Sequence, residues 1–279
     1  QFKMGDIMDQ DLSPATVVTL YLLDAVNLKL RPKLFRELRP GTRIVSHAFH
    51  MTEWQSDKSV EHPKARNDVI YLWIIPAPVG GVWEWETKTG DGEFMCQLAV
   101  KQQFQRIEGD LKAGQLGGSP ITEASLNGRD IAFSAVIRNG GRTITATFKG
   151  TVDGDTISGA QFWKEGEQGY SQGWVAKRKP FDLAGAWDVK VSNSPEPLDG
   201  LLQLVRKDKL LRASYVASKD KKAVALPSFI QWGTSIYFGI DDDEQPIGFF
   251  GSLDGEAMSG KVSRDGWKKE PTWTAQRTR

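Results

Sequence analysis

Residues 148–159 read FKGTVDGDTISG, and residues 249–260 read FFGSLDGEAMSG. In each stretch an Asp-Gly pair, Asp153-Gly154 or Asp254-Gly255, separates two short segments in which apolar and polar residues alternate. Asp-Gly is a preferred pair for a type I′ turn, because both central residues of that turn need a positive φ. The two stretches therefore predict two matching antiparallel hairpins, 101 residues apart.

Two further matches flank these hairpins in the same order. They are GVWEW at 81–85 with GAWDV at 185–189, and WVAKR at 174–178 with WTAQR at 273–277. The three offsets are 104, 101 and 99 residues. Self-similarity at a nearly fixed offset indicates a repeated structural unit. Residues 80–180 and 181–279 are therefore predicted to be two copies of one domain.

The copies have the pattern of an antiparallel meander. Phe94, Cys96, Leu98 and Val100 alternate with other residues, and turn signals recur about every 8–12 residues. We predict about eight strands per copy, a number that closes into a small barrel and so removes the exposed edges. The prediction is two antiparallel up-and-down β-barrels or strongly curled sheets, loosely similar to lipocalin-like and avidin-like barrels, which also begin with Gly-x-Trp.

Four tryptophans at the repeat boundaries have two interpretations. They are Trp83, Trp174, Trp187 and Trp273. In the interpretation that we favour, they fill the barrel ends and pack on the closing strands, with Arg178 and Arg277 over the rings as cation–π partners. In the alternative, they line a pocket for an aromatic, sugar or other apolar ligand.

Composition excludes several classes of protein. Lys and Arg total 36 and Asp and Glu total 35, for a net charge of +1. This balance argues against a broad electrostatic grip on nucleic acid, so we expect no nucleic-acid partner. No run of about 18 apolar residues occurs, so we expect no membrane span. The single cysteine, Cys96, excludes an internal disulfide and is predicted to pack in the core.

The first 79 residues follow a different pattern. Residues 16–23 form an apolar, β-branched run that is typical of a strand buried on both faces. Residues 31–38 predict a helix with Pro32 near its start, and residues 42–47 and 69–75 predict further strands. This order favours a partial Rossmann-like α/β segment with a parallel sheet. The whole chain is then an α+β multidomain protein, mainly β, with domains at 1–79, 80–180 and 181–279.

Four short segments carry a resemblance to a known family. They are GDIM at 5–8, ATVVTLYLL at 15–23, LKLRPKL at 28–34 and PGTRIVSH at 40–47. Together they resemble the C-terminal half of a class I S-adenosylmethionine-dependent methyltransferase, and most closely bacterial proteins related to protein-lysine methyltransferases. The β repeats resemble the C-terminal extension that some of these proteins carry.

The resemblance implies a cofactor, S-adenosylmethionine, and roles for five residues. Asp6 corresponds to the acidic residue that accepts a hydrogen bond from the adenine amino group, and Ile7 would pack on the adenine ring. Thr19, Tyr21 and Leu22 correspond to the strand end that faces the sulfonium methyl. The implied reaction is methyl transfer to a nitrogen of a protein or small molecule, for which positioning of the amine is the main requirement.

Two cofactor-binding features of the family have no counterpart in residues 1–79: the Gly-rich loop and the acidic residue that binds the ribose. We therefore expect methyltransferase activity only when a cofactor half is supplied, by residues before Gln1 or by another chain. The alternative is a non-catalytic module whose β-barrels bind an apolar ligand or a protein. The cytoplasm is the favoured compartment, and the periplasm stays open because the N-terminus reads as incomplete.

Metal binding is not predicted. His47 and His50 lie near Glu53, but residues three apart on a strand point to opposite faces. The three histidines of the chain form no zinc-binding helix motif. The acidic run at 241–244 lacks the spaced oxygens of a calcium loop and predicts a solvated hairpin tip.

Overall fold

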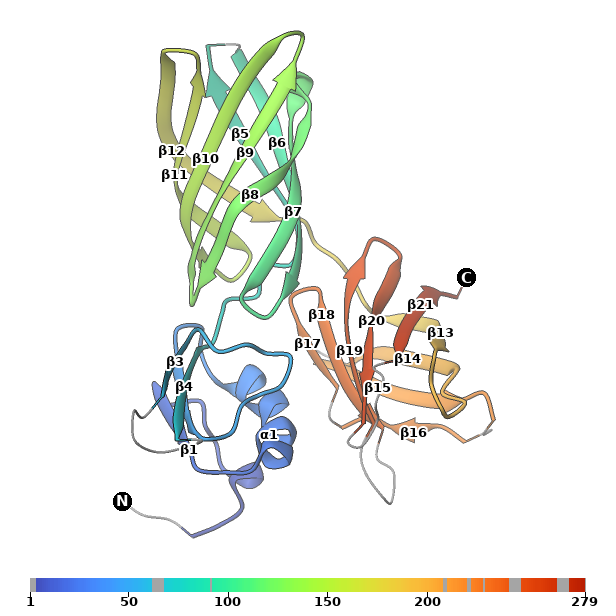
Figure 1. Cartoon of the computed structure of the whole chain (residues 1–279). Helices are drawn as coiled ribbons and strands as arrows, with labels where there is room; N and C mark the ends of the chain where they lie inside the picture. Colours follow the sequence, from blue (N-terminus) through green and yellow to red (C-terminus); the bar gives the residue numbers. More distant parts are fainter. Residues whose placement is uncertain are drawn as a thin grey trace. The chain divides into compact units, whose positions relative to one another are not determined.

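The computed structural model describes residues 4–61, 68–90, 92–207, 210–219, 222–227, 229–240, 247–264 and 271–278. The chain forms two compact units, Gln1–Arg178 and Lys179–Arg279, called here the first and second units (Figure 1). The predicted hairpin tip at 241–244 lies outside the described residues. Within the described part, no helix is long and apolar enough to cross a bilayer.

The first unit begins with a small mixed sheet. Its elements are η1 (Ile7–Asp9), β1 (Val17–Leu20), α1 (Asp24–Glu37), β2 (Arg43–His47), β3 (Lys58–Glu61) and β4 (Val69–Ile74), with strand order β1-β2-β4-β3. Only β1 and β2 are parallel, whereas β4 is antiparallel to both β2 and β3. The prediction of a parallel sheet is therefore wrong beyond its first pair. The reason is that a parallel connection needs a crossover of about a dozen residues, usually a helix, and α1 is the one α-helix of the described residues.

Strand β1 and helix α1 also differ from prediction. β1 is an edge strand with Val17 43% exposed, so it is not buried on both faces. The helix begins at Asp24, not near Pro32, which lies inside it. A proline inside a helix costs about 3 kcal/mol. Leu30 and Leu34 are each 0% exposed, and burial of each side chain stabilises the fold by about 1.5–3 kcal/mol, which offsets the cost of the proline.

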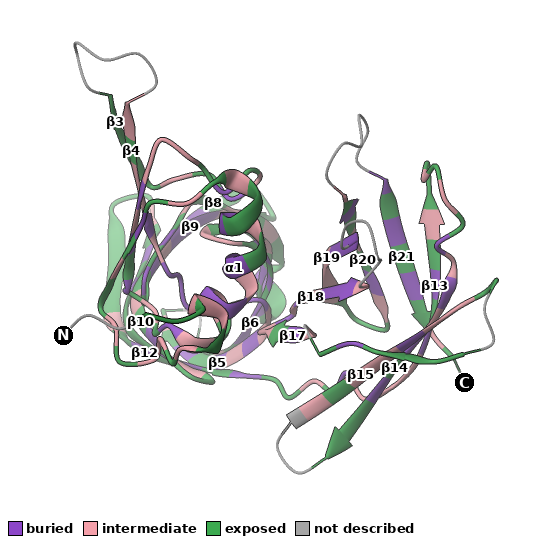
Figure 2. Ribbon diagram, turned by 90° about the horizontal axis from the view of Figure 1, so that it is seen from below, coloured by how far each residue is buried: buried purple, intermediate pink, exposed green. Residues whose placement is uncertain are grey.

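A closed eight-stranded barrel follows, as predicted. Its strands are β5 (Gly81–Thr89), β6 (Gly92–Gln103), β7 (Arg106–Ala113), β8 (Gly118–Asn127), β9 (Asp130–Asn139), β10 (Arg142–Asp153), β11 (Thr156–Glu165) and β12 (Gln168–Arg178), with the short helix η2 (Gly114–Leu116) between β7 and β8. Buried and exposed residues alternate along the strands (Figure 2). Cys96 is fully buried in this core, and its burial raises the pKa of the thiol to about 12.

The hairpin turns exist, but they are shifted by one residue from the prediction. Asp153 pairs with Thr156, so the two turn residues are Gly154 and Asp155. Positive φ is confined to Gly154 (57°) there and to Gly255 (62°) in the second unit. A positive φ at the first central residue only is the pattern of a type II′ turn, not type I′.

The turn between β6 and β7 joins the barrel to the small sheet. The Phe104 ring, at a positive φ of 55°, lies 5.6 Å from Trp54 and 5.7 Å from Phe35, and both ring pairs are stacked. The Gln105 side chain accepts a hydrogen bond from the Trp54 indole at 3.0 Å and donates to the Gln55 carbonyl at 2.7 Å. The core of the small sheet is therefore completed by a barrel hairpin.

The second unit is an open sheet in its described residues, whereas a second closed barrel was predicted. Its strands are β13 (Gly185–Ser192), β14 (Gly200–Lys207), β15 (Leu210–Ala217), β16 (Val224–Ala225), β17 (Ile230–Trp232), β18 (Ser235–Ile240), β19 (Ile247–Asp254), β20 (Ala257–Ser263) and β21 (Thr272–Arg277). The order is β16-β15-β14-β13-β21-β20-β19-β18-β17, so β16 and β17 are the edges.

The two units differ at one strand position. In the first unit, β8 pairs with both of its neighbours. In the second unit, the corresponding stretch is divided into β16 and β17. Each short piece pairs on one side only among the described residues.

The predicted tryptophan–arginine pairs are present in both units. Arg178 lies 4.3 Å from the centre of the Trp83 ring, and Arg277 lies 4.6 Å from that of Trp187. The Trp83 and Trp187 rings are fully buried, and the Trp174 and Trp273 side chains are almost fully buried. The structural interpretation of these residues is confirmed.

Candidate functional site

The carboxyl ends of the parallel strands β1 and β2 form one edge of the small sheet. Their register pairs Leu20 with Ser46, so Tyr21 and His47 follow side by side. In open α/β sheets, ligands bind outside the carboxyl ends of the parallel strands. This edge is therefore the candidate ligand-binding site.

An aromatic pair and a carboxylate meet there. The Tyr21 and His47 rings are stacked with 5.2 Å between their centres and 19° between their planes. His47 Nε2 lies 2.7 Å from Asp68 Oδ1. Because an ionised carboxylate only accepts hydrogen bonds, Nε2 is the donor, which leaves Nδ1 as the acceptor atom when the ring is neutral.

The buried side chains of Asn27 and Ser46 lie beneath this edge. Asn27, in the first turns of α1, is 0% exposed, and its Nδ2 donates to Ser46 Oγ at 3.4 Å. Asn27 Oδ1 is buried and makes no hydrogen bond among the residues that the structure describes. His50 is linked to the start of α1, because its backbone amide donates a hydrogen bond to Asp24 Oδ1 at 3.0 Å.

The five residues with implied cofactor roles fall into two groups. Asp6 is exposed and caps η1, where its Oδ1 accepts the Met8 amide hydrogen at 2.8 Å, and Ile7 is partly buried next to it. Thr19, Tyr21 and Leu22 lie at the end of β1: Thr19 is exposed, Tyr21 is 83% exposed, and Leu22 packs against the core. The end of β1 is thus open to solvent.

Sequence analysis missed the His47–Asp68 pair and Asn27. His47 was considered only as a metal ligand, yet the structure gives His47, His50 and Glu53 different partners: Asp68, Asp24 and Arg31. No group of three His, Cys, Asp or Glu residues able to hold a metal occurs in the described part. Position was a usable signal for His47 alone, since it ends a parallel strand, whereas Asn27 lies in α1 and Asp68 directly precedes the antiparallel strand β4.

A buried ion pair joins α1 to the segment that follows β2. Arg31 is 2% exposed, and its guanidinium donates to Glu53 Oε1 at 2.7 Å and to the Met51 carbonyl at 3.1 Å. Burial pushes the pKa of Glu53 upward, but the charge and hydrogen bonds of Arg31 and the hydroxyl of Thr52 outweigh burial and hold this pKa below its usual value.

This ion pair predicts a pH dependence of stability. A carboxyl group whose pKa is lowered by folding stabilises the folded state above its unfolded pKa of about 4.5, and this stabilisation is lost as the pH falls through the folded pKa. We expect Glu53→Gln to lower the free energy of unfolding by about 1–2 kcal/mol at pH 7, since it leaves Arg31 with a weaker partner, and by less at pH 3. Urea unfolding at both pH values measures this. The exposed Glu61→Gln is the control, and an equal loss at both pH values would contradict the assignment.

Comparison with known proteins relates the first segment of the chain to a methyltransferase family. Residues 1–58 match the family model described as the ANTKMT methyltransferase domain. This segment is methyltransferase-like. The predicted resemblance to methyltransferases is thereby supported, and residues 1–58 are called the methyltransferase-like segment below.

Two relatives give the extent of the similarity. A protein-lysine N-methyltransferase of Saccharolobus islandicus (strain REY15A) is 43% identical over 72 residues, 25% of this chain and 45% of that protein. The crystal structure of an RNA methyltransferase from Salinibacter ruber in complex with S-adenosyl-L-homocysteine is 51% identical, with a TM-score of 0.25, over 26% of this chain and 46% of that one. The chain therefore spans less than half the length of these relatives.

Proposed function

We propose that the methyltransferase-like segment is the acceptor-side half of an S-adenosylmethionine-dependent N-methyltransferase, with a protein lysine as the methyl acceptor. The observation that carries this proposal is the match of residues 1–58 to a methyltransferase family, together with the 43% identity to a protein-lysine N-methyltransferase. The division into domains at 1–79, 80–180 and 181–279 is part of the same proposal.

The described residues fit two ends of the cofactor. One oxygen of Asp6 is held by the turn, which leaves the other to accept from the adenine amino group, with Ile7 beside the ring. At the end of β1, Thr19, Tyr21 and Leu22 would border the methyl group. No described residue supplies a Gly-rich cradle for the amino-acid end, so that part must come from elsewhere. When bound, the cofactor supplies the methyl group.

Strand β1 offers a place for the rest of the sheet. Among the described strands it pairs only with β2, and Val17 in this strand is 43% exposed. An exposed apolar edge strand is a template for pairing with a further strand. This supports a sheet that continues beyond β1.

The neighbouring His47 would contact the acceptor. Its ring lies against Tyr21, and Asp68 fixes its orientation. The neutral ring presents Nδ1 as an acceptor, which suits a hydrogen bond from an incoming amine. The role proposed for His47 is to orient that amine and to take a proton from it.

Calorimetric titration with S-adenosylmethionine tests the proposal, using this chain and the full product of the gene that encodes it. We expect binding only when the Gly-rich half is present, and Asp6→Ala should then weaken it about tenfold, since one lost charge-assisted hydrogen bond is worth about 1.4 kcal/mol. Asp9→Ala, in the same turn, is the matched control. The proposal is contradicted if neither protein binds the cofactor. The assignment of lysine as the acceptor is contradicted if methyl groups are transferred to RNA and not to protein.

A further inference from the structure

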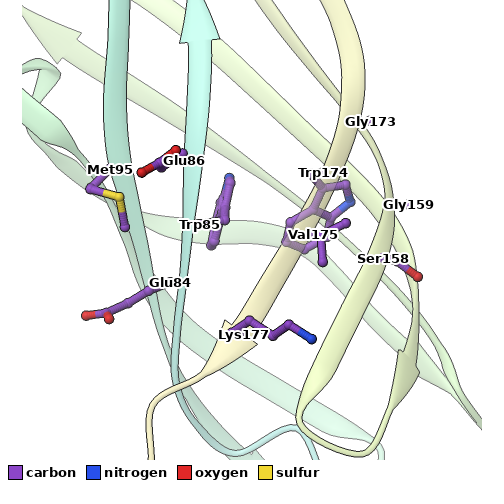
Figure 3. A pocket seen from close by; sticks show the side chains of 10 residues that line it. All are labelled: Glu84, Trp85, Glu86, Met95, Ser158, Gly159, Gly173, Trp174, Val175 and Lys177. Atoms are coloured by element: carbon purple, nitrogen blue, oxygen red, sulfur yellow. The ribbon is translucent and has the colours of Figure 1, made fainter.

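The barrel of the first unit has a weak seam between its first and last strands. β5 and β12 form only two residue pairs, Lys177 with Glu84 and Arg178 with Trp83. By contrast, β5 and β6 form nine pairs and β11 and β12 form ten. Past the second pair, β5 and β12 form no further residue pairs and diverge (Figure 3). Trp85, beside this gap, is 3% exposed and packs in the barrel core.

The second unit shows what a complete seam looks like. Its corresponding strands, β13 and β21, form six pairs. The residue that corresponds to Trp85 there is Val189, at the offset of 104 residues. In the first unit the indoles of Trp85 and Trp174 meet edge to face, with 5.0 Å between their centres. At this position the first unit, with two residue pairs in its seam, has an indole, and the second unit, with six, has a valine.

The separation creates a hollow in the barrel wall. It has a volume of about 560 Å³, and its lining includes Glu84, Glu86, Met95, Val175 and the two indoles. Met95 and Val175 are 50% and 55% exposed. A Cβ atom added to Gly173 would meet nothing closer than 3.8 Å, so the missing side chain of this glycine leaves part of the hollow empty. The size is that of a site for a small group.

The charge of the hollow is set by β5. Glu84 and Glu86 lie on the same side of β5 as Met95 (Figure 3), and no ion pair to Glu86 is present among the described residues. The cation at the other wall, Lys177, donates to Thr156 Oγ1 at 2.6 Å. In the second unit the counterpart of Glu86 is Lys190, which lies 3.4 Å from Asp188 and 3.6 Å from Asp199. The carboxylate at this position thus belongs to the first unit alone.

We propose that this hollow, residues 84–86, 95 and 173–175, binds the lysine side chain of a polypeptide. The aliphatic stem of lysine matches the exposed thioether of Met95 and the exposed Val175 side chain, and its ammonium matches the carboxylate of Glu86. A neutral apolar group would leave Glu86 unmatched, and an anion would be repelled. The inference goes beyond the proposed function, because this site lies on the barrel and its binding needs neither cofactor nor methyl transfer.

Binding of a blocked peptide, acetyl-Ala-Lys-Ala-amide, tests the site on the full chain. The readout is the NMR shift of the indole N–H groups of Trp85 and Trp174, assigned by Trp→Phe variants. We expect saturable shifts, and binding about tenfold weaker for the peptide with norleucine in place of lysine, which loses one charge interaction. Equal binding of the two peptides would overturn the proposal.

Three variants locate the binding. Glu86→Gln should weaken binding of the lysine peptide about tenfold while leaving the norleucine peptide unchanged. Gly173→Phe should abolish the shifts because its ring fills the hollow. Thr145→Phe, an equally large change at an exposed position of β10, should bind normally. Thermal unfolding checks that each variant folds. Undiminished binding by both Glu86→Gln and Gly173→Phe would exclude this hollow.

Discussion

Replacing Trp83 with alanine is expected to lower the free energy of unfolding of the first barrel by about 3–5 kcal/mol. The ring is fully buried, and its indole nitrogen donates to the Val79 carbonyl at 2.8 Å. The loss extends to Arg178, whose side chain is 5% exposed and whose guanidinium lies on the ring at 4.3 Å. Without the ring, this buried cation borders a cavity. Urea unfolding followed by circular dichroism measures the change.

The second unit provides the matched comparison. Trp187 is also fully buried, donates to the Leu183 carbonyl at 3.0 Å and lies under Arg277. Trp187→Ala should destabilise the second unit by a similar amount and leave the unfolding of the first unit unchanged. Val175→Ala, at a position that is 55% exposed in the first barrel, should change stability by about 0.5 kcal/mol or less. A loss below about 1 kcal/mol for Trp83→Ala would show that the ring does not support the barrel end.

Replacing Phe104 with alanine is expected to destabilise the small sheet by about 2–4 kcal/mol. The ring belongs to the barrel, yet it stacks on Trp54 and Phe35, and the Arg31 guanidinium lies 5.4 Å from its centre. Removing it opens the core of the small sheet, whereas the interior of the barrel stays filled. Hydrogen exchange should therefore accelerate in α1 and β2 and remain slow in β9 and β10.

Gln105→Ala separates packing from hydrogen bonding in the same turn. It removes the contacts to Trp54 and Gln55 but keeps the Phe104 ring, so we expect a loss of about 1 kcal/mol. Unchanged exchange in α1 of the Phe104→Ala variant would mean that the small sheet holds its core without the barrel.

Local sequence determined much of the β architecture. Alternation along 94–100 predicted a strand whose inward residues are buried, and the repeated Gly-x-Trp and Trp-x-Ala-x-Arg motifs predicted the stacking of Arg178 and Arg277 on their rings. These features could be predicted because they depend on residues close in sequence or on a motif that occurs twice. The methyltransferase resemblance was likewise carried by short contiguous segments.

The candidate site was predicted only in part. Thr19, Tyr21 and Leu22 were assigned through the family resemblance and stay a prediction, and the partner of His47, which lies 21 residues further along the chain, was not predicted. The α1 helix was misplaced because two of its buried residues, Asn27 and Arg31, are polar and hide the helical period. Their burial depends on Ser46, Met51 and Glu53, which only the folded chain brings near.

Whether each sheet closes into a barrel depends on the tertiary structure. The two copies share their motifs, yet one is a closed barrel and the other is open in its described residues, where the stretch that corresponds to β8 is divided into β16 and β17. The seam between β5 and β12 likewise has two residue pairs, against six between β13 and β21. The sequence by itself determined strands, repeats and the resemblance of the first segment to methyltransferases, because these are local patterns. Which edges pair, and where a hollow remains, was decided by side chains that meet only after folding.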